Sequence, residues 1–278
     1  MEEGSGASAL ATSIVLPVRE GDRGIGALLT AVRVFARALQ GAVEVVVVDD
    51  GTHDGLQSHV ERWRAQFSGL VVARHDQRKG RGAAVRTGVL AARGEYLLVV
   101  DPELAVPVEN AGALLERLRA GADIALITRG AAERESGSDG RSFLERAADT
   151  TVLRLSQLMV PHGARDCFAG LVGVRGRAAK KIAQRAQVSS PAWIVEWLAL
   201  AQYLGFQVAE CEQNFVRGPL LGERDRRTTR AFELLKDVWA TRRRLAGDEY
   251  SRASSTAALL NQTSFHKLDR DTLGPKKR

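Results

Sequence analysis

Two apolar runs that end in carboxylates constrain the fold of this chain more than any other feature. Residues 43–48 form a largely β-branched run followed by a pair of aspartates that ends at Asp50. Residues 96–100, YLLVV, are followed by Asp101 and Glu103. Runs this apolar are typical of strands buried on both faces of a sheet. Paired acids at the ends of two such strands indicate a polar site at the edge of the core.

Strands and helices alternate along most of the sequence. The patterns predict strands at residues 13–18, where Pro17 ends the run, and at 43–48, 70–73, 96–100, 124–128 and 206–210, with a strand or hairpin at 165–176. They predict helices at 28–39, 55–67, 110–120, 143–159, 193–204 and 228–245, of which 193–204 and 228–245 are amphipathic. A further helix is predicted within 78–94, where a glycine-marked turn opens it and Gly94 closes it. This alternation predicts a doubly wound, mostly parallel α/β sheet with helices on both faces. In such folds ligands bind beyond the carboxyl ends of the strands, where the acids gather.

The 278 residues divide into one large domain and smaller flanking segments. We expect a disordered leader at 1–12, the α/β domain at 13–225, an amphipathic basic helix at 226–246 and a flexible, disordered tail at 247–278. No apolar run is long enough to span a bilayer. The leader carries acids where a secretory signal carries lysine or arginine, which favours a cytoplasmic location. The net charge of +7 suits an anionic partner. Aromatic residues make up only 5% and do not interleave with the basic ones, which argues against nucleic acid.

The second pair of acids has the geometry of half a cation site. Side chains at i and i+2 of an extended chain point the same way, so Asp101 and Glu103 share a face. Hard oxygen ligands suit Mg²⁺ or Mn²⁺, which complete their shells with water and phosphates, and the implied ligand is a diphosphate. The segment KGRG adds the cations Lys79 and Arg81 at the start of a helix. The alternative for both features is a set of solvated turn and surface residues.

Four motifs in order resemble the family 2 glycosyltransferases. They are LPVRE from position 16, VVVVDDGTHDG from 45, KGRGAAVRTGVLAARGEYLLVVDPEL from 79 and LITRG from 126. Within that family the chain is most similar to the dolichyl-phosphate or polyprenyl-phosphate mannose and glucose synthases, and the likeness covers about residues 12 to 225. It implies a GT-A fold and transfer of a hexose, with inversion, from GDP-mannose or UDP-glucose to a polyprenyl phosphate, with Mg²⁺ or Mn²⁺.

The resemblance assigns the nucleotide side of the site. It implies that Pro17 and Asp50 line the nucleoside pocket, with Glu20 close to the position of the family's glutamate. Asp101 would hold the nucleotide and help to order the metal. Lys79, from the glycine-marked segment, joins these as a contact to the bound sugar nucleotide.

The resemblance also assigns the phosphate and metal contacts. Glu103 falls where the family's last DxD aspartate binds the metal, and Arg129 matches an arginine that contacts phosphate. Arg217 and Arg224 lie in a basic loop expected to close over the diphosphate or the acceptor phosphate. Asp166 is retained from the family's later DxxxGF motif. The predicted catalytic set is Asp101, Glu103, Asp166 and Arg129.

Departures from the family pattern keep two alternatives open. DPELA replaces DADLQ at 101–105, which fits a catalytically inactive subunit that binds a sugar nucleotide or a partner. Leu171 and Val172 replace an aromatic residue and a cation, which fits a cytosolic enzyme with a small hydroxyl acceptor. A hydroxyl acceptor requires a general base, for which Asp166 and Glu196 are the candidates.

The basic helix at 226–246 has two interpretations. It groups apolar residues that include Val238 and Trp239 with several lysines and arginines. Such a helix can lie at an anionic membrane surface, where a lipid-linked acceptor is found. This would place the protein at the cytoplasmic face of the membrane, by peripheral contact or through a membrane subunit. Alternatively its apolar stripe packs on the domain.

Overall fold

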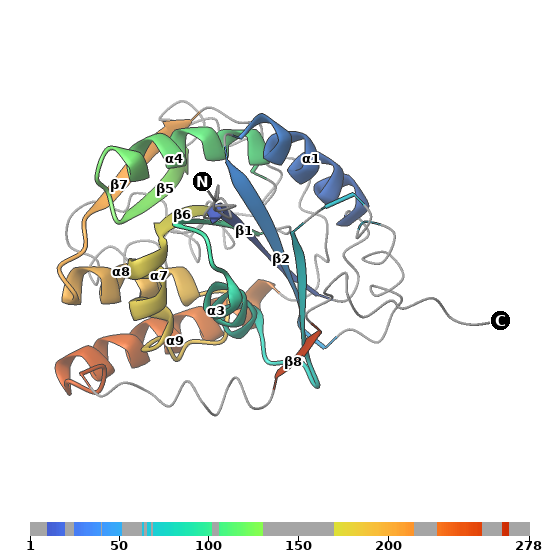
Figure 1. Ribbon diagram of the computed structural model, residues 1–278. Helices are drawn as coiled ribbons and strands as arrows, with labels where there is room; N and C mark the ends of the chain where they lie inside the picture. The colour runs from blue at the N-terminus through green and yellow to red at the C-terminus, as the bar shows by residue number, and fades with distance from the viewer. Residues whose placement is uncertain are drawn as a thin grey trace, which may run out of the picture.

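The structure of the protein is a computed structural model that confirms the predicted α/β architecture (Figure 1). It describes residues 10–19, 25–39, 41–51, 63, 66–67, 69–101, 106–129, 170–213, 227–251 and 263–266. The predicted helix at 143–159 lies outside these residues, and so does nearly all of the one at 55–67.

The described strands form one eight-stranded, mostly parallel sheet. In sequence order they are β1 (Leu10–Val18), β2 (Ala42–Asp49), β3 (Leu70–His75), β4 (Tyr96–Val100), β5 (Ile124–Arg129), β6 (Leu171–Arg175), β7 (Val208–Gln213) and β8 (Thr263–His266). In space the order is β7-β5-β6-β4-β1-β2-β3-β8. β1 pairs in parallel with both β2 and β4, so these three strands end at the same edge of the sheet.

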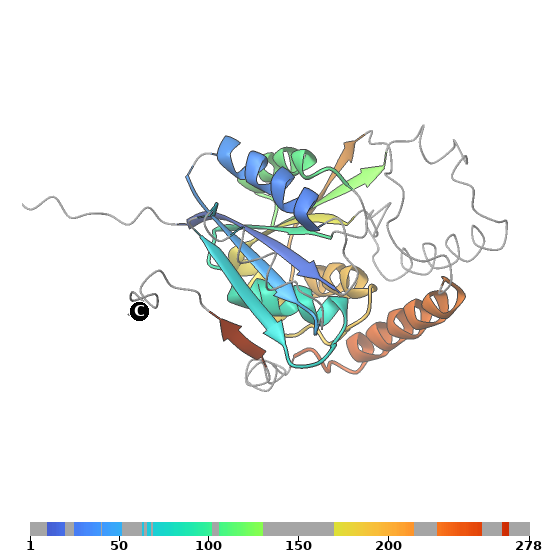
Figure 2. The same ribbon diagram turned by 90° about the vertical axis from the view of Figure 1, so that its right-hand side faces the viewer.

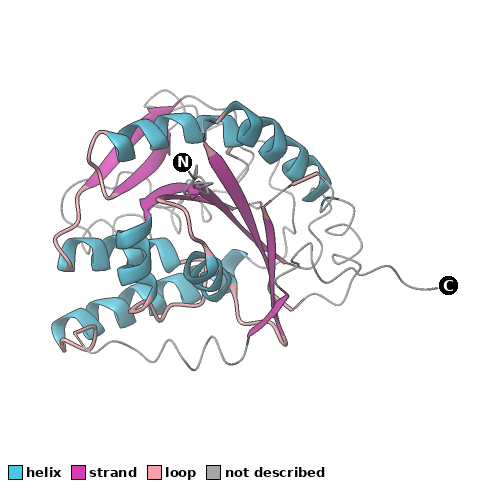
Figure 3. Ribbon diagram, viewed as in Figure 1, coloured by secondary structure: helices cyan, strands magenta, loops and turns pink. Residues whose placement is uncertain are grey.

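Helices cover both faces of the sheet, as the alternating pattern predicts (Figures 2 and 3). The helices are α1 (Ile25–Ala38), α3 (Arg81–Ala91), α4 (Ala111–Arg119), α7 (Gly176–Ala183), α8 (Trp193–Tyr203) and α9 (Arg227–Ala246), with a short 3-10 turn, η2 (Val108–Asn110). α1 and α4 lie on one face, and α3, α7, α8 and α9 lie on the other.

The valine run of β2 shows why the sheet must be covered twice. Val46 and Val48 belong to the core on the α3 side, whereas Val45 and Val47 belong to the core on the α1 side. All four are buried, because successive side chains of a strand point to opposite faces. The prediction of strands buried on both faces is therefore confirmed.

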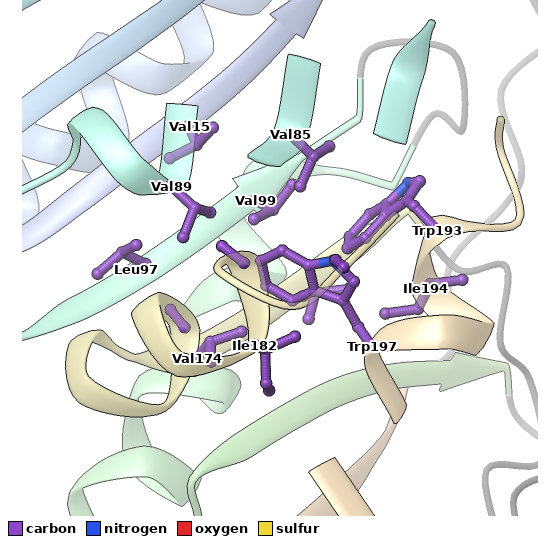
Figure 4. Close-up of a cluster of buried hydrophobic side chains, with 14 of the residues drawn as sticks. Val15, Val85, Val89, Leu97, Val99, Val174, Ile182, Trp193, Ile194 and Trp197 are labelled. Carbon is purple, nitrogen blue, oxygen red and sulfur yellow. The ribbon is translucent and has the colours of Figure 1, made fainter. Parts of the chain in front are cut away.

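The core on the α3 side is built around two tryptophans of α8 (Figure 4). The rings of Trp193 and Trp197 meet edge to face with centroids 5.4 Å apart, an arrangement that aromatic pairs favour. Residues 193–201 of α8 are all buried. The prediction that this helix is amphipathic is therefore wrong, because α7, α3 and α9 enclose it.

β1 ends one residue after Pro17, at the last residue of the predicted strand 13–18. The strand continues to Val18, and Pro17 lies opposite Val48 of β2. β4 pairs with β1 only from Thr12 to Val15. The missing N–H of Pro17 therefore falls beyond the last paired residue on that side, where a proline is tolerated.

The segment predicted as strand or hairpin at 165–176 contributes the strand β6, which runs antiparallel between β4 and β5. Two positions in the predicted tail are also structured. Tyr250 is buried, and β8 pairs antiparallel with β3, with His266 opposite Val72. β1 begins at Leu10, within the segment 1–12 that was predicted as a leader.

Candidate active site

A cleft of about 480 Å³ opens at the carboxyl ends of β1 and β2. Its walls come from the ends of both strands, the segment before α3, the loop between α7 and α8, and α9. The residues that line it are Pro17, Val18, Arg19, Asp50, Arg78, Lys79, Gly80, Arg81, Ala84, Gln187, Val188, Ser189, Ser190, Pro191, Lys236, Asp237 and Arg244. Six of these side chains are cationic and two are acidic. The cleft therefore suits an anionic ligand.

Asp50 is fixed by donors that all come from other parts of the chain. Its Oδ1 accepts hydrogen bonds from the backbone N–H of Lys79 at 2.8 Å and from His75 Nδ1 at 2.8 Å, and its Oδ2 accepts one from the N–H of Gly80 at 2.9 Å. Burial by itself raises the pKa of this carboxyl group, but the hydrogen bonds from His75 and the two backbone amides outweigh it and lower the pKa below its usual value. Asp50 is therefore an ionised anchor for the segment before α3.

The His75 ring continues this network into the core. Its Nε2 lies 2.9 Å from Thr87 Oγ1 of α3, and both residues are fully buried. Because a carboxylate can only accept, Nδ1 carries the proton shared with Asp50. Sequence reasoning missed His75 because it ended this strand at Ala73. The rule that selected Asp50, a polar residue at the carboxyl end of a buried strand, would have selected His75 as well.

Asp101 has a partner that the motif does not indicate. Its Oδ1 accepts a hydrogen bond from Arg81 Nη1, and the two side chains form a buried ion pair. Asp50 and Asp101 therefore bind consecutive parts of the same segment, residues 79–81. The acids of β2 and β4 do approach one edge of the sheet, but the basic segment lies between them.

The glycines of KGRG bring this segment against the loop between α7 and α8. Gly80 has φ of +98°, and a Cβ there would lie 2.4 Å from the Ser189 carbonyl oxygen. A Cβ on Gly82 would lie 2.2 Å from the Val188 carbonyl oxygen, and the Gly82 N–H donates to Ser189 O at 2.8 Å. These glycines thus serve backbone packing, and the cations beside them face the cleft.

Glu196 of α8 has a structural role and not the general-base role considered from the sequence. It is fully buried and accepts hydrogen bonds from the backbone N–H groups of Gln187 and Val188 and from the Tyr250 hydroxyl at 2.6 Å. Arg244 Nη1 lies 3.9 Å from Glu196 Oε1. Burial raises the pKa of Glu196, against the effect of these donors. The carboxylate has no access to the cleft, so it cannot take a proton from a substrate.

The predicted contact residues divide by position. Pro17, Asp50 and Lys79 line the cleft. Asp101 does not line it but pairs with Arg81, which does. Arg129 is the last residue of β5, which β6 separates from β4. The other predicted contacts lie outside the described residues: Glu20, Glu103, Asp166, Arg217 and Arg224. Sequence reasoning did not select Arg244 or the 187–191 loop, because no local signal brings segments so far apart in sequence to one cleft.

A metal site is incomplete in the described part of the chain. No group of three metal-ligating side chains occurs among the described residues. Asp101, the predicted ligand among them, has Arg81 against one carboxylate oxygen, and Asp50 is held by His75 and two amides. These residues alone do not fit a divalent cation.

α9 packs one side on the domain and exposes the other. Val238 is buried, whereas Trp239 is 63% exposed, with the Arg243 guanidinium 5.5 Å from its ring centroid. The sequence placed these two apolar residues on one side, which is wrong. Among the described residues, no helix combines the length and the apolar character that a membrane crossing requires.

Several curated proteins resemble this chain. Glycosyltransferase AglD of Haloferax volcanii is 29% identical over 218 residues, which cover 73% of this chain and 33% of AglD. A dolichyl-phosphate beta-glucosyltransferase of Dictyostelium discoideum is 27% identical over 190 residues, 64% of this chain and 56% of that protein. The chain thus spans between about a third and just over half the length of the curated relatives it matches first.

Solved structures share the fold. Glucosyl-3-phosphoglycerate synthase of Mycobacterium tuberculosis, in complex with Mn²⁺, UDP-glucose and phosphoglyceric acid, gives a TM-score of 0.61 at 14% identity over 84% of this chain and 79% of that one. Mannosyl-3-phosphoglycerate synthase of Rubrobacter xylanophilus gives 0.59 at 16% identity, over 86% and 75%. The family model of Glycosyl transferase family 2 matches residues 13–177, more than half of the chain. The chain therefore belongs to glycosyl transferase family 2, as its motifs predicted.

Proposed function

We propose that this chain transfers a hexose, mannose or glucose, from a nucleoside-diphosphate sugar to a polyprenyl phosphate with inversion. The observation that carries the proposal is the cleft beyond β1 and β2, which is lined by six cationic side chains and by Asp50, whose pKa is lowered. Its volume of about 480 Å³ lies within the range of small-molecule sites. The names of the relatives, which include dolichyl-phosphate beta-glucosyltransferases, support a lipid-phosphate acceptor.

The donor diphosphate binds along residues 78–81 in this proposal. Lys79 and Arg81 are held at the cleft by the two buried acids, Asp50 and Asp101. As the bond from the sugar to the diphosphate breaks, negative charge develops on the leaving group, and cations fixed in advance stabilise it. The Asp50 carboxylate and Pro17 lie at the end of the cleft that receives the nucleoside.

The acceptor needs no strong general base. A phosphate monoester is ionised at neutral pH, so the cations of the cleft need only orient it for attack on the face of the sugar opposite the leaving group. The basic loop with Arg217 and Arg224 and the phosphate-contacting Arg129 belong to this proposal as acceptor and diphosphate contacts. An α-linked donor then gives a β-linked product, which NMR coupling constants identify.

A divalent cation, Mg²⁺ or Mn²⁺, held by Asp101 and Glu103 is the finer part of the proposal. Mn²⁺ with UDP-glucose in a structure of the same fold supports it. Glu103→Ala should lose metal-stimulated activity and Glu103→Asp should keep it, and an alanine variant with unchanged metal dependence would contradict this assignment.

The location of the reaction is proposed as cytoplasmic, with peripheral contact between α9 and a membrane. Trp239 and Arg243 are the exposed residues that would make this contact. Co-sedimentation with anionic and with neutral vesicles tests it. If the protein binds neither kind of vesicle, the proposed membrane contact is wrong, and the lipid acceptor must reach the site in another way.

The transfer assay combines UDP-glucose or GDP-mannose with a short-chain polyprenyl phosphate in detergent, with and without Mn²⁺. We expect a lipid-phosphate hexose from one donor. Hydrolysis or transfer that ignores the lipid would favour the enzyme with a small hydroxyl acceptor, for which Asp237 on α9 is a carboxylate that lines the cleft. Binding of a sugar nucleotide without turnover would favour the inactive subunit, and absence of both would reject the proposal.

A further inference from the structure

α9 lines the cleft together with the 78–81 segment. Lys236, Asp237 and Arg244 of this helix line it. The sequence pattern indicated only two roles for α9, a membrane-surface helix or a helix that packs on the domain. Its place in the cleft gives the site a second group of cations, contributed by a segment that follows the domain in the sequence.

The Arg244 guanidinium lies near the buried Glu196 carboxylate, and one of its nitrogens is available to a ligand. Its Nη1 is 3.9 Å from Glu196 Oε1, too long for a hydrogen bond, and this buried atom makes none to any described residue. The side chain is 24% exposed and lines the cleft. A guanidinium has five N–H donors in a planar fork that matches a phosphate, so a guanidinium at the cleft with one buried nitrogen that makes no hydrogen bond points to an anion site.

Glu196 and Tyr250 determine the position of the Arg244 side chain. The Tyr250 hydroxyl donates to Glu196 Oε1, and the same carboxylate accepts from the backbone N–H groups of Gln187 and Val188, which also line the cleft. The end of α9 and the 187–191 loop are therefore joined through one buried carboxylate. These two residues are positioning residues, because neither lines the cleft.

We propose that Arg244, together with Lys236, forms a phosphate subsite distinct from the 78–81 segment. This rests on the proposed function and deepens it. A single diphosphate is already matched by Lys79 and Arg81 on one wall, so the α9 wall takes the second phosphate group of the reaction, that of the acceptor.

The test compares Arg244→Gln and Lys236→Gln with Arg242→Gln, an exposed cation on the same helix. Losing charge-assisted hydrogen bonds to a phosphate should raise the KM for a short-chain polyprenyl phosphate roughly 10- to 100-fold. The Kd for UDP or GDP should change less than about twofold, and Arg242→Gln should leave both constants unchanged. If nucleotide binding weakens and the acceptor KM does not, the assignment of this subsite to the acceptor phosphate is overturned.

A direct binding measurement keeps this test separate from the transfer reaction. Inorganic phosphate is titrated by calorimetry into the wild type and the same variants, whose thermal melting confirms folding. Arg244→Gln should weaken phosphate binding roughly tenfold even if no transfer is found. Equal phosphate affinity and equal acceptor KM in wild type, Arg244→Gln and Lys236→Gln would overturn the subsite.

The positioning role has its own measurement. Tyr250→Phe removes only the hydroxyl that donates to Glu196, so it should raise the acceptor KM with little change in kcat. A purely structural role would lower stability without moving KM.

Discussion

Asp50→Asn is the sharpest test of how the site is built. The carboxylate accepts from His75, from the Lys79 N–H and from the Gly80 N–H. An asparagine amide has one oxygen, so its NH₂ group must face at least one of these donors. The substitution is nearly isosteric, and any effect therefore reports the charge and the lost acceptor.

The cost follows from the geometry. A hydrogen bond to a charged group contributes roughly 1.5–3 kcal/mol, and a neutral one about 1 kcal/mol. Losing one charge-assisted bond and weakening the others should lower the free energy of unfolding by roughly 3 kcal/mol at pH 7. For a chain of 278 residues, this corresponds to a fall in Tm of about 5 °C.

The effect of Asp50→Asn should depend on pH in a defined direction. The pKa of Asp50 is lower in the folded protein than in the unfolded chain. Its contribution is therefore complete above about pH 5 and is lost as the pH falls through the folded-state pKa. The difference between variant and wild type should shrink below about pH 4.

Urea unfolding followed by tryptophan fluorescence measures this difference at several pH values. Glu109→Gln, at an exposed carboxylate of η2, is the control and should change stability by less than about 0.5 kcal/mol. A change of that small size for Asp50→Asn, or a difference that stays constant down to pH 3.5, would refute the role of Asp50 as the anchor of residues 79–80.

Three further perturbations address the walls of the cleft. Gly82→Ala places a Cβ 2.2 Å from the Val188 carbonyl oxygen, and thermal melting should show a loss of about 1–3 kcal/mol. Tyr250→Phe removes the hydrogen bond to Glu196 and should cost about 2 kcal/mol in urea unfolding. Burial lowers the pKa of Lys180 to about 8 although Glu44 opposes this, so the stability of the wild type should rise relative to Lys180→Met between about pH 8 and 10.

Matched controls separate these effects from general damage. Gly112→Ala, in α4 where no atom lies within 4 Å of the added Cβ, should be neutral or stabilising by up to about 1 kcal/mol. A similar loss at Gly82 and Gly112 would contradict the close packing of the 187–191 loop. A stability difference for Lys180→Met that is flat across this pH range would contradict the lowered pKa.

The sequence was sufficient for those parts of the fold that depend on local patterns. The run ending at Asp50 and the run ending at Asp101 are apolar on both faces, which predicts buried parallel strands whatever surrounds them. The amphipathic prediction failed for α8, because residues 193–201 are apolar on all sides apart from Glu196 and are all buried, a pattern that indicates an enclosed helix.

The pairing of strands that are distant in the sequence could not be predicted, and the reason is physical. β6 inserts antiparallel between β4 and β5, and β8 pairs with β3 from near the end of the chain. Which edge a short strand joins is decided by contacts between distant segments and not by propensity. The wall that Arg244 contributes to the cleft depends on packing of the same kind.

The contacts of Asp50 and Asp101 in the structure change how the acids at the strand ends are interpreted. Carboxylates at the ends of β2 and β4 invite a metal interpretation, yet each binds the segment that separates them: Asp50 through two backbone amides and Asp101 through Arg81. Removing one partner of a buried pair leaves an uncompensated charge, so these acids hold the basic segment in place before any ligand arrives. Cations fixed in advance need little reorganisation when charge develops on a diphosphate. On this argument Asp101→Asn should weaken nucleoside-diphosphate binding even without metal, and an effect confined to metal-containing assays would show that Asp101 acts only through the proposed metal.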